Sequence, residues 1–144
     1  MNRLRLAILG QFLLTVPEEK FNLEHWQCST TACAVGWACS IPEFQQQGLS
    51  IGEPWGDGIL IPLFEGEKHF EAAEKFFDIS WRDAEWLFMP CQENYSKPID
   101  VAMRIAYLLK LDSYDRINRL NSSFQEEIES ERYIVSKKAQ AAKA

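Results

Sequence analysis

Residues 70–88, FEAAEKFFDISWRDAEWLF, decide the fold class because they show the period of an α-helix twice. The first half has apolar residues at the spacing of one helix face, namely Phe70, Ala73, Phe76 and Phe77. The pattern breaks at Asp78, and Ser80 can cap a second helix, with Asp83 three residues on in a capping-box-like arrangement. The expected inward face of the second helix is Trp81, Ala84, Leu87 and Phe88. The stretch therefore predicts an αα-hairpin with its turn at residues 78–80.

Toward the N-terminus, the run MNRLRLAILGQFLLTV resembles a signal peptide, because two arginines precede an apolar stretch. Gln11 interrupts that stretch, however, and the residues at its end, TVPEEK (15–20), contain no small-x-small cleavage site. Three leucines instead follow one stripe of a helix: Leu6, Leu9 and Leu13. We therefore expect a packed helix over residues 3–15 that stops before Pro17. We also expect a cytoplasmic protein, whose cysteines stay reduced.

The segment CSTTACAVGWAC, residues 28–39, holds three of the four cysteines. Structural zinc sites use four sulfur or nitrogen ligands, usually paired as C-x₂₋₄-C. Here the spacings are Cys28-x₄-Cys33 and Cys33-x₅-Cys39. Because six residues of a helix rotate by about 600°, Cys33 and Cys39 would point about 120° apart. The spacing favours no metal site, and we expect no cofactor.

The same segment is otherwise uncharged and rich in small residues, which is typical of a buried helix that its neighbours approach closely. Three hydroxyl side chains could cap this helix: Ser29, Thr30 and Thr31. We expect it to end near Ser40 and to anchor the core through Trp37. A disulfide between Cys28 and Cys33 stays open as an alternative.

His25 and Cys28 form an alternative site, for a metal-binding protein or a thiol enzyme. Cys28 lies just before the expected helix N-terminus, a position that lowers a thiol pKa, and His25 is close enough in sequence to act as its base. The chain has one other histidine, His69, which is expected on a glutamate-lined helix surface.

The stretch GLSIGEPWGDGILIP, residues 48–62, departs from the helical period. Leu49 and Ile51 alternate with polar or small residues, turn residues follow, and a second short apolar run ends at Ile61. This pattern predicts a small β-hairpin or two short strands near residues 49–62.

Further along the chain, Pro98 suits the first turn of another helix. The expected inward face of that helix is Ile99, Ala102, Ile105, Ala106 and Leu109. Ser113 can cap the next helix, and a possible capping box at Ser123 leaves open whether the C-terminal stretch is two helices or one kinked helix. We expect a mainly α domain over residues 1–138, with about five to seven helices, followed by a frayed tail at 139–144.

Three segments together resemble a pattern of small uncharacterised bacterial and phage proteins. They are FNLEHWQCSTTACAVGWA, KFFDISWRDAEWLFMP and PIDVAMRIAYLL. The shared pattern is a C-x-T-x-x-C-x-x-G-W-A helix followed by F-F-x-[IL]-[ST]-x-x-x-A-x-x-L-F. The resemblance covers about residues 20–110 and implies a common fold, but it brings no known activity and no site residues.

The composition indicates a protein that binds another protein rather than an enzyme. A net charge of −6 disfavours nucleic acid, which needs clustered basic residues, and no apolar run is long enough for a membrane span. Tryptophans beyond the needs of a small core are typical of interfaces, and the candidates are Trp26, Trp55, Trp81 and Trp86. Trp55, in a Gly/Pro loop, either contacts the partner or packs locally over Ile51 or Ile59.

Two further alternatives stay open. The αα-hairpin could be a helix-turn-helix DNA binder, although its second helix offers only Arg82 among more numerous acidic and aromatic residues. The protein could also be a small-molecule or nucleotide sponge. The sequence does not predict the identity of the partner, the host process or the oligomeric state.

Overall fold

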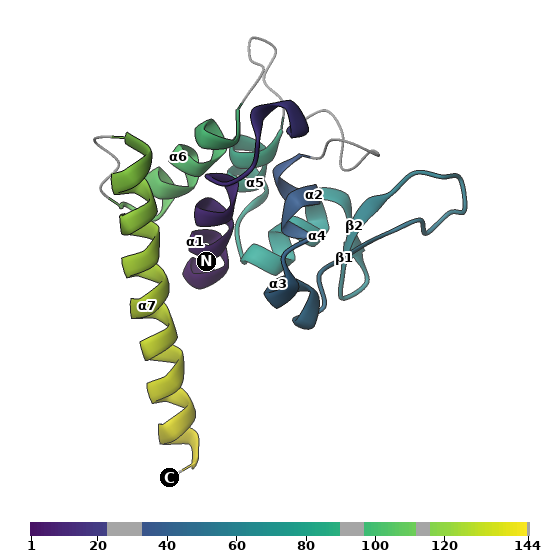
Figure 1. Ribbon diagram of the computed structural model, residues 1–144. Helices are drawn as coiled ribbons and strands as arrows, with labels where there is room; N and C mark the ends of the chain where they lie inside the picture. The colour runs from purple at the N-terminus through teal and green to yellow at the C-terminus, as the bar shows by residue number, and fades with distance from the viewer. Residues whose placement is uncertain (23–32, 90–96, 112–115, 144) are drawn as a thin grey trace.

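The computed structural model describes residues 1–22, 33–89, 97–111 and 116–143, and it folds them into a group of packed helices with a small sheet at one side (Figure 1). The elements are α1 (Arg3–Leu13), the 3₁₀ helix η1 (Glu18–Lys20), α2 (Ala34–Ala38), α3 (Pro42–Gln46), β1 (Ser50–Gly52), β2 (Ile61–Phe64), β3 (Glu67–Lys68), α4 (His69–Phe77), α5 (Trp81–Phe88), α6 (Pro98–Leu108) and α7 (Arg116–Lys143). The prediction of a mainly α fold with short strands near residues 49–62 is confirmed.

The N-terminal helix α1 lies at the centre of the helical layer, against α6 and α7. Its three stripe leucines are fully buried, as predicted, and Asn2 caps it by accepting the N–H of Arg5 at 3.0 Å. Gly10 makes the closest approach, because a Cβ placed there would overlap the ring of Phe124 from α7. Arg3 strengthens the same contact through an ion pair of 2.7 Å between its Nε and Glu127.

The αα-hairpin is confirmed as α4 and α5. Asp78 adopts a left-handed conformation with φ of 52°, which ends α4, and Ser80 Oγ accepts the N–H of Asp83 at 3.1 Å. One expectation is wrong: Trp81 does not point inward but is 54% exposed. Periodicity assigns a side chain to a helix face, but Trp81 is the first residue of α5, at the corner where the chain turns out of α4.

The cysteine segment forms a shorter helix than expected. The helix α2 begins only at Ala34, and the N-cap is Cys33 rather than a hydroxyl residue at 29–31, since the Cys33 sulfur accepts the N–H of Gly36 at 3.4 Å. The expected burial is confirmed for Cys33, Ala34, Val35, Ala38 and Cys39. Trp37, expected to anchor the core, is only half-buried: it packs against the core, and its Nε1 donates to the carbonyl of Lys20 at 3.0 Å near the surface.

The sheet is antiparallel, with the order β1-β2-β3, and it packs on α4. Ile51 of β1 pairs with Pro62 of β2, within the predicted region. The hairpin between β2 and β3 was not predicted. Its two turn residues, Glu65 and Gly66, have φ of 47° and 84°, the positive values that a tight hairpin requires.

The last two helices close the fold. Pro98 occupies the first turn of α6, as predicted, and four of the five expected inward residues are buried, Ile99 being partly exposed. The C-terminal stretch is one helix, α7, so Ser123 starts no new helix. The reason is tertiary: Leu120, Phe124 and Ile128 recur at helical spacing and are buried on both sides of Ser123. Fraying at 139–144 stays a prediction.

Candidate functional site

The predicted binding residues do not form one cluster. Trp26 and the alternative site, His25 and Cys28, lie outside the described residues, as does the possible partner of Cys33 in a disulfide. Trp55, Trp81 and Trp86 are 56%, 54% and 44% exposed. Among the described rings, no contact joins these three tryptophans, so they mark three separate places on the surface.

Trp86 belongs to an apolar surface that α5 and α6 build together. Its ring lies 5.7 Å from the ring of Tyr107 on α6, with the two planes tilted by 58°. Met103, one helical turn before Tyr107, is 46% exposed, and Tyr107 is 74% exposed. We call Trp86, Met103 and Tyr107 the α5–α6 patch.

The local sequence explains why these side chains face outward. In α5 the buried residues are Ala84, Leu87 and Phe88, and Trp86 falls outside that stripe. In α6 the stripe is Val101, Ala102, Ile105 and Ala106, and positions 103 and 107 lie one turn apart on the opposite side. Sequence reasoning missed Met103 and Tyr107. Their signal was two large apolar residues at i, i+4 on the face where polar residues are usual.

Charged residues border the α5–α6 patch. Arg82, one turn before Trp86, and Glu85 beside it are both exposed. An apolar centre with a polar border of both signs is the usual anatomy of a protein–protein interface.

Trp55 projects on the loop between β1 and β2. Side chains shape that loop: Glu53 accepts the N–H of Gly58, and Asp57 accepts the N–H of Ile59 at 3.1 Å. The indole stacks on the ring of His69, with centroids 5.6 Å apart and planes 29° apart, and Lys68 Nζ lies 5.4 Å from its centre. Local packing therefore occurs against His69 and Lys68, while the expected contact residue Ile59 remains 55% exposed.

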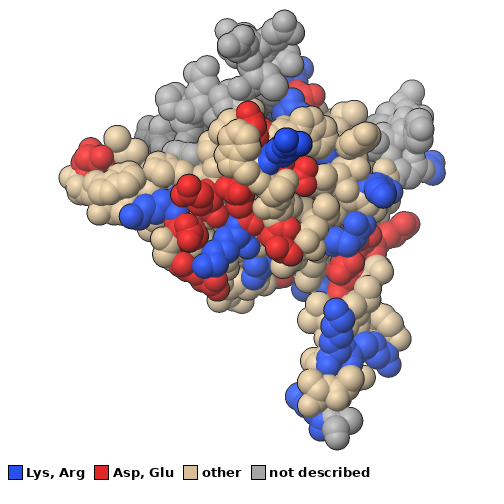
Figure 2. All heavy atoms as spheres, turned by 180° about the vertical axis from the view of Figure 1, so that it is seen from behind, with Lys and Arg blue, Asp and Glu red and all other residues tan. Residues whose placement is uncertain are grey.

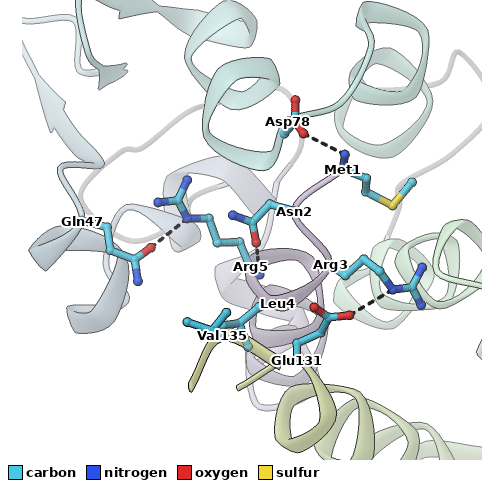
Figure 3. Close-up of a pocket in the computed structure, with 9 residues that line it drawn as sticks. All are labelled: Met1, Asn2, Arg3, Leu4, Arg5, Gln47, Asp78, Glu131 and Val135. Carbon is cyan, nitrogen blue, oxygen red and sulfur yellow. Dashed lines mark hydrogen bonds and ion pairs between the residues drawn. The ribbon is translucent and has the colours of Figure 1, made fainter. Parts of the chain in front are cut away.

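A pocket of about 360 Å³ opens at the N-terminus of α1, between α4 and α7 (Figure 3). Its cationic groups already bind protein acceptors. Arg5 donates from Nε to Gln47 at 2.8 Å and from its NH1 group to the carbonyl of Phe76 at 2.7 Å, and its guanidinium lies 4.0 Å over the Phe76 ring. The Met1 amine pairs with Asp78 at 2.8 Å and lowers the pKa of that carboxyl. Because both signs of charge are matched within the pocket, it favours no class of ligand.

The described thiols are poor nucleophiles. Burial raises the pKa of Cys33 to about 11, and burial together with the nearby Cys33 raises the pKa of Cys39 to about 12. Nucleophilic cysteines require the opposite shift. Within the described part of the chain, no three His, Cys, Asp or Glu side chains are grouped closely enough to hold a metal ion.

None of the helices within the described ranges is both long enough and apolar enough to cross a membrane. No family model matches the chain, and neither does any curated protein or solved structure.

Proposed function

We propose that this protein acts by binding another protein, in a bacterial or phage regulatory setting, and that the α5–α6 patch is the contact surface. The observation that carries the proposal is the exposed pair of Trp86 and Tyr107. Tryptophan and tyrosine contribute most to interface energies, because they bury a large area with few rotatable bonds.

The geometry of the α5–α6 patch favours a protein partner over DNA. It occupies the exposed face of the second hairpin helix, where a helix-turn-helix protein would read bases. Here that face presents Trp86, and the basic Arg82 is accompanied by Asp83 and Glu85. Acidic side chains repel phosphate, whereas an apolar centre fits a groove or pocket on a protein.

Affinity capture from the native host with three baits tests this proposal: the wild-type protein, Trp86→Ala and Trp55→Ala. Trp55→Ala is the matched control, because it removes another exposed indole, 56% exposed against 44% for Trp86, at a different place. We expect the wild type and Trp55→Ala to capture the same protein and Trp86→Ala to lose it. Capture that survives Trp86→Ala but is lost with Trp55→Ala would contradict the proposal and assign the contact to the β1–β2 loop.

A further inference from the structure

The helix α7 extends beyond the rest of the molecule (Figure 1). Its first half is anchored on α1 by Leu120, Phe124 and Ile128. Every residue from Arg132 to Lys143 is exposed. We call residues 132–143 the projecting half of α7; at 1.5 Å per residue it is about 18 Å long. Its first turn still touches the body, where Arg132 pairs with Glu43 of α3 at 2.8 Å.

The projecting half begins with exposed apolar side chains. Tyr133, Ile134 and Val135 are 63%, 41% and 55% exposed. Three consecutive large apolar residues lie on different sides of a helix, so the body of one molecule covers none of them fully. Such a group is stabilised when a second surface covers it.

Charge is divided between the two parts of the molecule. All 21 acidic residues lie within residues 1–131, together with 11 basic ones, which gives this part a formal charge of −10. The projecting half has no acidic residue and four basic ones: Arg132, Lys137, Lys138 and Lys143. In Figure 2 the body carries acidic side chains interspersed with basic ones, whereas the charged side chains on the far part of the projecting helix are all basic.

The α4–α5 corner offers the complementary surface. Glu71 is exposed and Glu74 partly so, and they lie one turn apart on α4. The exposed indole of Trp81 follows just after the end of that helix. We define Glu71, Glu74 and Trp81 as the corner. The corner, an indole beside two carboxylates, is therefore complementary to the projecting half of α7, in which an apolar group is followed by two lysines.

The position of the corner suits a two-fold arrangement. Asp78, between α4 and α5, lines the same pocket as Val135, where α7 leaves the body (Figure 3). The turn that joins α4 to α5 and the start of the projecting half therefore border the same pocket, and in a two-fold dimer each copy would offer both surfaces to the other.

A membrane surface and DNA fit the projecting half of α7 less well than a second copy does. From Arg132, the lysines at 137 and 138 lie about 140° and 240° around the helix, so no single basic face is available for a membrane surface. A polyanion such as DNA would meet the repulsion of a body with ten net negative charges.

We propose that the projecting half of α7 docks on the α4–α5 corner of a second copy of this chain. Lys137 and Lys138 meet Glu71 and Glu74 of that copy, and Tyr133 with its neighbours covers Trp81. The proposed contact shares α5 with the α5–α6 patch but does not include the patch residues Trp86, Met103 and Tyr107.

Sedimentation velocity on the purified full chain tests the proposal, over rising concentrations in buffer of about 0.1 M ionic strength, where charges act over about 10 Å. We expect the wild type to approach twice the chain mass of 16.7 kDa. K137E/K138E and E71K/E74K should each remain monomeric. Their equimolar mixture should regain the dimer, because the projecting half of each variant then meets a corner of opposite charge on the other variant.

Circular dichroism establishes that each variant folds, and K20E/K110E is the matched control. It changes the net charge as much as K137E/K138E does, at two exposed lysines elsewhere, and should dimerise like the wild type. A monomeric wild type at all concentrations would overturn the proposal, as would a dimer insensitive to K137E/K138E. A mixture that stays monomeric would overturn the assignment of the corner. If the wild type is monomeric but binds DNA or anionic vesicles, and K137E/K138E abolishes this binding, then the projecting half of α7 binds a polyanion or a membrane rather than a second copy.

Discussion

Gly10 is the residue on which the contact between α1 and α7 depends. The ring of Phe124, fully buried, occupies the place where a side chain at position 10 would begin. The sequence gives no sign of this, because a single glycine in an apolar helix looks only like a weak helix former. Phe124 lies more than a hundred residues away along the chain, so only the tertiary structure reveals the reason.

Gly10→Ala should therefore lower the free energy of unfolding by about 1–3 kcal/mol, the usual cost of overpacking. Helix propensity alone predicts the opposite sign, a gain of about 1 kcal/mol. Thermal and urea unfolding measure the change. The double variant with Phe124→Leu should recover part of the loss, and a Gly10→Ala protein more stable than the wild type would contradict the account of this contact.

The buried thiols give a second prediction for single residues. Because the pKa values of Cys33 and Cys39 are raised to about 11 and 12, almost no thiolate exists at neutral pH. In a background with Cys28→Ser and Cys91→Ser, native protein should react with a thiol reagent far more slowly than unfolded protein. Equal rates in the two states would show that these thiols are accessible.

The elements follow local signals where those signals are strong. Apolar period and caps predicted α1, α4, α5 and α6, and Asp78 and Ser80 lie where the hairpin turns. Local signals failed where long-range packing or backbone conformation decides. The sequence did not reveal that Cys33 would cap α2, that α7 would continue through Ser123, or that Glu65 would adopt the positive φ of a hairpin turn.

At the scale of the element, Ser80 tests the start of α5. Ser80→Ala removes the acceptor for the N–H of Asp83 and should cost about 0.5–2 kcal/mol of stability without loss of the fold. Ser136→Ala, at an exposed position inside α7, is the control and should be nearly neutral. Equal melting temperatures for the two variants would show that this cap does not stabilise α5.

The candidate site was only partly accessible to sequence reasoning. Of the tryptophans proposed from the sequence as interface residues, Trp55, Trp81 and Trp86 are exposed, although Trp81 was expected to point inward. Their role in binding stays a prediction. The partners Met103 and Tyr107 were missed, because they come from α6 and the packing of α5 on α6 is a tertiary property. The packing of the helices decides which aromatic residues share a surface, and a local sequence pattern does not reveal that packing.

For the molecule as a whole, the distribution of charge predicts which class of partner is disfavoured. A body with a formal charge of −10 should not bind duplex DNA near physiological salt, although the projecting half of α7 is basic. A gel-shift or fluorescence anisotropy titration measures this. Micromolar, salt-sensitive binding that is lost with Arg82→Ala would restore the helix-turn-helix interpretation. Binding that is lost with K137E/K138E would instead show that DNA contacts the projecting half of α7.

The most direct test of the central claim is the dissociation constant of the captured partner for the wild-type protein and for Trp86→Ala, measured by isothermal titration calorimetry. If the α5–α6 patch is the contact surface, truncation at its centre should cost at least 2 kcal/mol, or about 30-fold in affinity, with little change in melting temperature. An affinity unchanged within about twofold, in a variant that remains folded, would contradict the claim that this patch binds the partner.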